Sequence, residues 1–219
     1  LIKKFNNKSI VKGFTTNPSL MRKAGAKNYS KYCQNILKVT RKPISFEVFA
    51  DDIKNIINQA LKIKSWGNQV YVKVPVTNSK GVFLGKVIKY LNNKNIKLNI
   101  TAVYTAKQTS NILKNLNKKT KVIISIFAGR MSDKGKDPIP EIEKSIILAK
   151  KFKNVEILWA SVREPYNYMQ AKKLKCHIIT VPPKIIEKIE NFGTTYEKLT
   201  KDTVKAFLVD SKKSRFKII

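Results

Sequence analysis

Lys73 is the residue whose type and surroundings most strongly indicate covalent chemistry in this sequence. It interrupts the strand-like run Val-Tyr-Val-Lys-Val-Pro-Val at residues 70–76. Because strand side chains alternate between two faces, the valines share one face and Lys73 shares the other with Tyr71 and Pro75. Burial disfavours a charged ammonium, and the free amine is the nucleophile that forms a Schiff base with a carbonyl. The alternative interpretation is a solvated lysine on an edge strand.

Four further strand-like runs separate polar from apolar side chains in the same way. In each run, one face corresponds to the Lys73 face of residues 70–76. The residues on these faces are Ser45 and Glu47, Asn99 and Thr101, Ser125 and Phe127, and Ser161 and Arg163. In the last run, Ala160 and Val162 are expected on the opposite, helix-facing side. A barrel would direct the polar faces into its upper lumen, near the carboxyl ends of the strands, where barrel enzymes build their sites.

The polar residues divide by the chemistry they can perform. Glu47 and Thr101 can hold a water that carries protons during imine formation and hydrolysis. Guanidinium groups suit phosphate, which Arg130 and Arg163 can clamp. The groups that can bind sugar hydroxyls are Asn17, Asn99 and Ser125. The combination predicts a sugar phosphate as the substrate class.

Strand-like runs alternate with helical patterns along the whole chain, which indicates repeated βα units and a parallel sheet. The predicted strands span residues 11–14, 44–49, 70–76, 98–103, 122–127, 157–162 and 177–181. Helical patterns span residues 53–61, 82–91, 106–116, 139–152, 166–174 and 200–209. We therefore expect the α/β class and one (β/α)8 barrel domain over residues 1–219. Since eight strands close such a barrel, the first strand is expected to lie upstream of this chain.

The composition favours a cytoplasmic protein without a metal site. No run resembles a membrane span or a secretory signal. Cys33 and Cys176 lie far apart and are expected to be reduced thiols, and His177 is the only histidine, which excludes multi-histidine metal sites. His177 is expected to be a packed or capping residue.

The formal net charge of +31 raises the alternative of nucleic-acid binding. However, the lysines are spread along the chain without a dense basic block, and aromatic residues do not interleave with them. A solvated basic surface is therefore favoured over a nucleic-acid interface.

Five motifs resemble those of the transaldolase family, which includes the fructose-6-phosphate aldolases. They are Gly-Phe-Thr-Thr-Asn-Pro-Ser-Leu at 13–20, Val-Lys-Val-Pro-Val-Thr at 72–77, Asn-Ile-Thr-Ala-Val-Tyr at 99–104, Ser-Ile-Phe-Ala-Gly-Arg at 125–130 and Ala-Ser-Val-Arg at 160–163. The resemblance implies a (β/α)8 barrel that moves a dihydroxyacetone unit between sugar phosphates, as in the pentose phosphate pathway. It implies no cofactor, and a homo-oligomer formed through terminal helices.

The resemblance also implies a role for each matching residue. Lys73 matches the imine-forming lysine, and Glu47 and Thr101 match the pair that holds a water. Residues matching the positions for dihydroxyacetone hydroxyls are Asn17, Asn99 and Ser125, and those matching the phosphate site are Arg130, Ser161 and Arg163.

Two features of the resemblance bear on the exact reaction. The family carries a catalytic aspartate on its first strand, which Asp51 and Asp52 do not match. The aldolase branch typically has Gln at the position of Glu47 and Tyr at the position of Phe127, so both positions favour transfer. An aldolase that releases free dihydroxyacetone stays the alternative, and a basic nucleic-acid-binding barrel is a third hypothesis.

Overall fold

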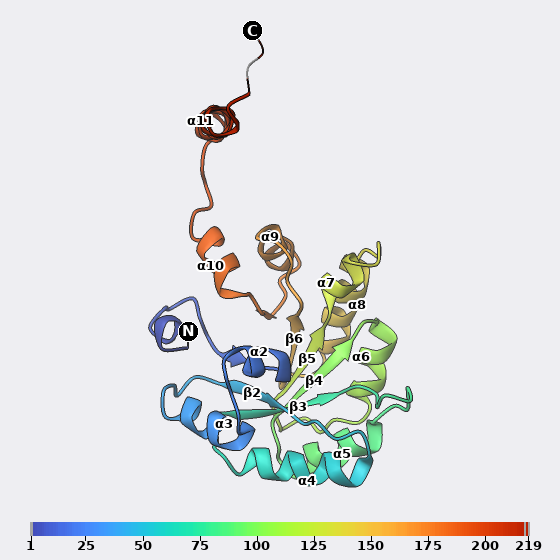
Figure 1. Cartoon of the computed structure of the whole chain (residues 1–219). Helices are drawn as coiled ribbons and strands as arrows, with labels where there is room; N and C mark the ends of the chain where they lie inside the picture. The colour runs from blue at the N-terminus through green and yellow to red at the C-terminus, as the bar shows by residue number, and fades with distance from the viewer. Residues whose placement is uncertain (1, 217, 219) are drawn as a thin grey trace. The chain divides into compact units, whose positions relative to one another are not determined.

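The protein is described by a computed structural model that covers residues 2–216 and 218, so residues 1, 217 and 219 lie outside the description. The chain divides into two compact units, Leu1–Pro182 and Pro183–Ile219 (Figure 1). The expectation of one domain over residues 1–219 stays a prediction. The two units are described in turn.

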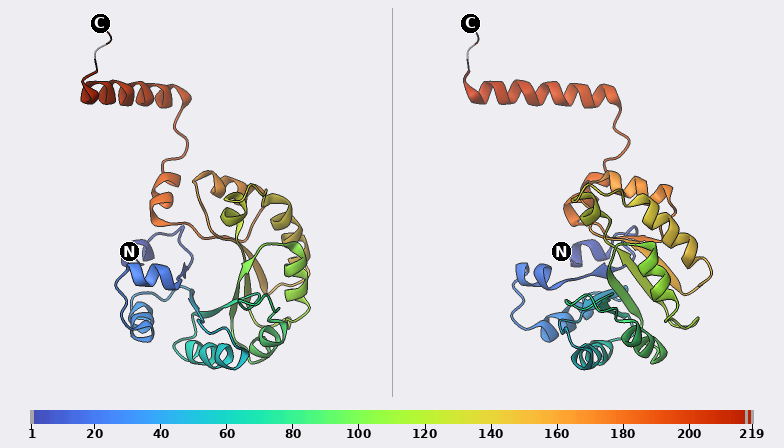
Figure 2. Two further views of the ribbon diagram at one scale, coloured as in Figure 1. Left: turned by 45° about the vertical axis from the view of Figure 1, so that its right-hand side comes forward. Right: turned by 90° about the vertical axis from the view of Figure 1, so that its right-hand side faces the viewer.

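The first unit is built on a parallel sheet whose strands follow one another in sequence order. Within residues 2–216 and 218 the strands are β1 (Phe14–Thr15), β2 (Ile44–Glu47), β3 (Val70–Pro75), β4 (Leu98–Val103), β5 (Val122–Ile126), β6 (Val155–Trp159) and β7 (Ile178–Ile179). Every neighbouring pair is parallel. The sheet curls into an open barrel (Figure 2), which confirms the predicted α/β barrel class with seven of its eight strands among the described residues.

Helices alternate with these strands along the first unit. They are α1 (Ile2–Asn6), α2 (Pro18–Lys23), α3 (Tyr29–Leu37), α4 (Ile53–Lys64), α5 (Gly85–Asn93), α6 (Ala106–Leu113), α7 (Ala128–Ser132), α8 (Ile139–Ala149) and α9 (Tyr166–Lys173). Helix α4 shows why they cover the convex side of the sheet: it begins at its N-cap Asp52 and buries Ile56, Ala60 and Ile63.

Both faces of the central strands are buried, as expected for a parallel sheet covered by helices. In β3 the side chains of Val70, Val72 and Val74 are fully buried, and Tyr71 and Lys73 on the other face are also largely shielded from solvent. Since β3 lies between β2 and β4 and Lys73 is shielded from solvent, the alternative of an edge-strand lysine is wrong.

Two element boundaries differ from the sequence prediction for local reasons. Strand β1 begins at Phe14 rather than at residue 11, since the preceding residues form a turn in which Val11 N donates to Lys8 O at 3.1 Å. It ends at Thr15, and the chain then enters α2, which Asn17 caps by accepting a hydrogen bond from Leu20 N at 2.8 Å. Helix α5 begins at Gly85 rather than at residue 82, since Thr77 and Phe83 pair as an antiparallel bridge across a turn.

The second unit contains α10 (Pro183–Ile189) and α11 (Tyr196–Ser214). Thr195 caps α11 by accepting a hydrogen bond from Lys198 N, and Lys198 pairs with Asp202 one turn later at 2.7 Å. The predicted helix at 200–209 lies within α11. In the part of the chain that the structure covers, none of the helices combines the length and apolar character needed to cross a membrane.

Candidate active site

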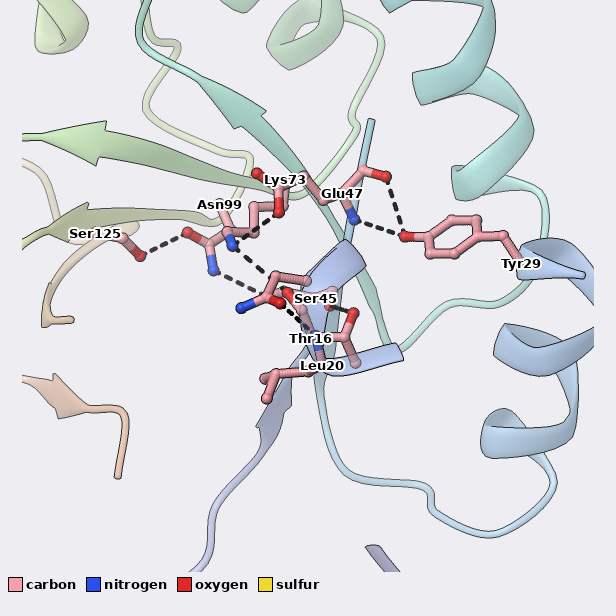
Figure 3. A network of polar contacts seen from close by, with 9 residues as sticks. Thr16, Leu20, Tyr29, Ser45, Glu47, Lys73, Asn99 and Ser125 are labelled. Carbon is pink, nitrogen blue, oxygen red and sulfur yellow. Dashed lines mark hydrogen bonds and ion pairs between the residues drawn. The ribbon is translucent and has the colours of Figure 1, made fainter. Parts of the chain in front are cut away.

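The amine of Lys73 lies against a carboxylate inside the curled sheet. Parallel register places Glu47, Lys73 and Asn99 side by side on β2, β3 and β4. Lys73 is 8% exposed, and its Nζ lies 3.1 Å from Glu47 Oε2 and 3.5 Å from the carbonyl oxygen of Thr16 (Figure 3). The carboxylate is thus placed to take a proton from the ammonium when the amine reacts.

A buried network of polar side chains links three strands next to Lys73. The Nδ2 group of Asn99 donates to Ser45 Oγ at 2.9 Å, and Ser125 Oγ donates to Asn99 Oδ1 at 2.7 Å (Figure 3). All three side chains are buried, and they come from β2, β4 and β5. Because both ends of the Asn99 amide are engaged, its orientation is fixed.

Thr101 lies two residues beyond Asn99, where β4 is irregular. The register with β5 shifts between Ile100 and Val103, and Ala102 adopts a positive φ of 60°. Such bulges occur often beside active sites, where they redirect a side chain. Thr101 is 1% exposed, and its Oγ1 finds no hydrogen-bond partner among the described residues. A buried hydroxyl without a partner is costly, so this position suits a bound water or a ligand hydroxyl.

Asn17 and Tyr29 approach the same end of the sheet from helices. The Oδ1 atom of Asn17 accepts the capping hydrogen bond from Leu20 N, so its Nδ2 group is the one that can donate to a ligand. The hydroxyl of Tyr29 accepts a hydrogen bond from Glu47 N at 2.9 Å and donates one to Glu47 O at 3.0 Å. Tyr29 was not predicted from the sequence, since strand alternation gives no signal for a helical residue that binds backbone.

The two predicted phosphate-binding arginines line one cavity of about 540 Å³, and each already has a partner. The Arg163 guanidinium donates to Asp133 from Nε at 3.0 and 3.1 Å and from Nη2 at 2.6 Å. These bonds lower the pKa of Asp133 below its usual value, so the carboxylate stays ionised. The Arg130 guanidinium lies 5.2 Å from the centre of the Phe127 ring, a cation–π contact.

Phe127 connects this cavity to the interior of the sheet. Its ring packs against a buried cluster formed by Tyr71, Ile123, Leu158 and Ala160. Tyr104, which also lines the cavity, meets the Phe127 ring edge-on at 6.1 Å between centroids. The predicted interior orientation of Phe127 is confirmed.

Ser161 shows where the predicted alternation is wrong. Ala160 packs with Tyr71 and Leu158, and Leu158 is the register partner of Ser125, so Ala160 lies on the interior face rather than the helix-facing one. Strand β6 ends at Trp159, and Ser161 turns the chain with a φ of 66°. Its place at a phosphate stays a prediction.

Helix α7, which carries Arg130, and the loop that carries Arg163 approach each other closely at Gly129. A Cβ atom at Gly129 would overlap the carbonyl oxygen of Ser161. The same carbonyl accepts a hydrogen bond from Arg163 Nη1 at 3.3 Å. The backbone preceding Arg130 and the backbone preceding Arg163 are thereby in direct contact.

The remaining candidate groups have structural roles. Nδ1 of His177 accepts a hydrogen bond from Ile157 N at 3.2 Å, which confirms the capping role expected for it, although the side chain is exposed rather than packed. Cys33 and Cys176 are free thiols, as predicted, and burial raises their pKa values to about 12 and about 11. Outside the undescribed residues 1, 217 and 219, no group of three or more His, Cys, Asp or Glu side chains is placed to hold a metal ion.

Sequence comparisons give a consistent set of relatives. The model of one family, described as "Transaldolase/Fructose-6-phosphate aldolase", matches residues 1–218. A "Probable transaldolase" of Nitrosopumilus maritimus is 32% identical over 210 residues, which covers 90% of this chain and 90% of the relative. Another of Thermoanaerobacter sp. is 31% identical over 218 residues, covering 99% and 94%. A third, of Clostridium kluyveri, is 33% identical over 187 residues, covering 84% and 82%.

Similar solved structures support the fold alone. An inosine 5' monophosphate dehydrogenase from Legionella pneumophila has a TM-score of 0.52 at 12% identity, over 78% of this chain and 57% of that one. A mandelate oxidase has a TM-score of 0.50 at 10% identity, over 68% and 50%. The match spans 50% and 57% of the length of these structures, and at such identity their chemistry does not transfer.

Proposed function

The chain belongs to the transaldolase/fructose-6-phosphate aldolase family, and on that premise we propose that it is a transferase that moves a dihydroxyacetone unit between sugar phosphates through a Schiff base on Lys73. The observation that carries the proposal is the buried Lys73 amine, 3.1 Å from the Glu47 carboxylate. A shielded amine beside a proton acceptor is what attack on a ketone requires.

The proposed reaction begins with the transfer of a proton from Lys73 to Glu47. The amine attacks the ketone carbon of the donor to form a carbinolamine, which loses water to become an iminium. Glu47 returns its proton as water leaves the carbinolamine. The iminium then draws in the electron pair of the carbon–carbon bond one carbon further along, while the hydroxyl on the departing carbon gives its proton through the bound water to Glu47, so an aldose phosphate leaves and an enamine stays on Lys73. An acceptor aldehyde then adds to the enamine, and water releases the new ketose phosphate.

Other interior groups serve this chemistry in the proposal. The unpartnered hydroxyl of Thr101 and the Glu47 carboxylate hold the water that carries protons. Asn17, Asn99 and Ser125 bind the hydroxyl groups of the dihydroxyacetone unit. Arg130 and Arg163, which line the cavity, bind the phosphate together with Ser161, and the phosphate replaces Asp133 as the partner of the Arg163 guanidinium.

Borohydride trapping tests the covalent step. The protein is incubated with fructose 6-phosphate, reduced with borohydride, digested and mapped by mass spectrometry. An adduct on Lys73 is expected, since reduction fixes the imine as a stable amine. An adduct on a different lysine, or no adduct at all, would contradict the proposal.

An aldolase that releases free dihydroxyacetone is the second candidate. Phe127 favours transfer, because a ring without a hydroxyl cannot help water or a proton reach the enamine. Cleavage of fructose 6-phosphate is measured with and without erythrose 4-phosphate. Transfer predicts that cleavage depends on the acceptor; equally fast release without it supports the aldolase.

The cellular setting is part of the proposal. We place the protein in the cytoplasm and in the pentose phosphate pathway, acting without a cofactor. A homo-oligomer is proposed because α11 exposes Leu199, Phe207 and Leu208, which another copy would shield from water. Analytical ultracentrifugation checks this. The net charge of +31 is assigned to a solvated surface, and salt-sensitive retention on DNA without any sugar-phosphate turnover would overturn that assignment.

A further inference from the structure

The strand that carries Glu47 extends past the end of its neighbour. The last register pair between β1 and β2 is Thr15 with Ser45, followed by a hydrogen bond from Thr16 N to Ser45 O of 3.1 Å. Along β2 the backbone groups of alternate residues face opposite neighbours. Ser45 bonds toward β1, and Val48 N bonds to Lys73 O of β3 at 3.1 Å, so the N–H and C=O of Glu47 face the β1 side.

Within residues 2–216 and 218 no strand meets those two groups, because the chain has already turned at Asn17 and Pro18 into α2. Unpaired backbone groups shielded from water are costly. The phenol of Tyr29 takes the place of the absent strand: one hydroxyl accepts from Glu47 N and donates to Glu47 O (Figure 3). It completes the ladder at the residue whose carboxylate contacts Lys73.

The Tyr29 ring is itself held in place. Asn28 caps α3 by accepting a hydrogen bond from Lys31 N at 2.9 Å, which sets the first turn that carries Tyr29. The ring meets Phe49 edge-on at 4.4 Å and lies 5.9 Å from Trp66. These ring contacts do not involve the hydroxyl.

The groups that face the phenol keep it neutral. Burial raises the pKa of Tyr29 far above its usual value, with the nearby Cys33 sulfur and the Glu47 carboxylate adding to the effect. Burial also raises the pKa of Cys33 to about 12. The phenol therefore keeps the proton that it donates to Glu47 O throughout the neutral range.

We propose that Tyr29 is a positioning residue for the Lys73–Glu47 pair: its hydroxyl fixes the Glu47 peptide and thereby directs the carboxylate at the amine. Tyr29 acts through Glu47 and does not touch the reacting atoms. The catalytic consequence rests on the proposed function; the hold on the peptide does not.

The experiment compares Tyr29→Phe with the wild type. This change keeps the ring contacts and removes only the hydroxyl. We expect kcat to fall roughly ten- to a hundredfold, the scale of a small misplacement of reacting groups, with KM within about twofold. The Glu47 amide is expected to exchange hydrogen faster, as measured by deuterium uptake resolved to residues 44–49.

Two controls separate positioning from general destabilisation. Tyr32→Phe removes a phenol from the same helix, whose hydroxyl makes no hydrogen bond to the described part of the chain, and should match the wild type. Ile36→Val loosens the packing of α3 without touching Tyr29, so it should lower the melting temperature while kcat per folded molecule stays unchanged.

Each outcome decides the proposal. Wild-type kcat in Tyr29→Phe, or a loss no greater than that of Ile36→Val at equal folded fraction, overturns it. So does unchanged exchange at Glu47. Suppose that the wild type forms no adduct with fructose 6-phosphate, but the backbone amide of Glu47 exchanges hydrogen faster in Tyr29→Phe. The positioning role of Tyr29 then stands and the proposed function fails.

Discussion

The site has two regions that hold their polar groups in different ways. In the interior, the Asn99 side chain is fixed by hydroxyls from two other strands. Lys73, which is 8% exposed, contacts the Glu47 carboxylate there. In the cavity, Arg163 pairs with Asp133 with both side chains nearly half exposed, at 46% and 45%. Hydrogen bonds shielded from water are stronger and better directed than exposed ion pairs, which solvent and salt screen.

The difference suggests a division of labour. A rigid interior suits covalent chemistry, in which small displacements cost rate. An exposed cavity with a carboxylate already on one arginine suits an anion that must enter and leave within each turnover. Substitutions in the interior should therefore lower kcat, and substitutions in the cavity should change KM.

The largest effect is expected from Lys73→Met, which keeps the length of the side chain and removes the amine. Without an imine the transfer rate should fall at least about a thousandfold, and the borohydride adduct should vanish. The matched control is Lys97→Met, which removes a lysine whose Nζ donates to the backbone of Asn68. An adduct that survives in Lys73→Met would show that a different amine reacts.

Asn99→Ala should have the next largest effect, because it leaves the hydroxyls of Ser45 and Ser125 without their partner. We expect kcat to fall roughly a hundredfold and the free energy of unfolding to fall by about 1–3 kcal/mol. Steady-state kinetics and urea denaturation measure the two losses. Asn115→Ala, on a side chain that donates to Asn111 O, is the control. A rise in KM with normal kcat would contradict the assignment of the interior to catalysis and of the cavity to substrate binding.

Arg163→Lys tests the cavity with a smaller expected effect. A lysine keeps the charge but loses the planar fork, so KM for a phosphorylated donor should rise roughly tenfold while kcat stays near normal. Unphosphorylated fructose, assayed at high concentration, should show no change, and Arg41→Lys on the surface serves as the control. A loss confined to kcat would show that Arg163 acts in the chemical step, as the interior residues do, rather than in substrate binding.

Asp133→Asn is expected to have the smallest effect and the opposite sign. Asp133 is ionised at neutral pH, and its hydrogen bonds to Arg163 hold its pKa below the usual value, so it competes with phosphate for the guanidinium. Removing that charge should lower KM for the phosphorylated donor roughly two- to threefold, and added salt should shrink the difference. Were KM to rise instead, the main role of Asp133 would be to orient Arg163.

The sequence predicted the interior better than the cavity, and the reason is physical. Alternation reveals a site where one face is polar and the other apolar, as at Lys73, Asn99 and Ser125. In β6 apolar residues lie on both faces, including Leu158 and Trp159. The sequence pattern therefore does not show which residues of β6 face the interior, and Ser161 was assigned to the wrong face. Its left-handed backbone, at a point where its carbonyl lies against Gly129, has no counterpart in the alternation pattern.

Contacts that join distant segments through side chains were also beyond the sequence. The bond from Tyr29 to Glu47 spans 18 residues and depends on β1 ending early, which only the assembled sheet reveals. The pair formed by Arg163 and Asp133 spans 30 residues and joins two loops. Neither pair has a fixed spacing that a motif could encode.

The contact between Gly129 and Ser161 limits how donor selectivity can be re-engineered. Since no side chain fits between Gly129 of α7 and the loop at Ser161, the backbone distance between Arg130 and Arg163 is set by the scaffold and not by any side chain in the cavity. Variant libraries aimed at donors with other anionic groups should therefore leave position 129 as glycine. Diversity belongs at Tyr104, Lys134 and Lys136, which line the same cavity and can change its reach and charge without moving its walls.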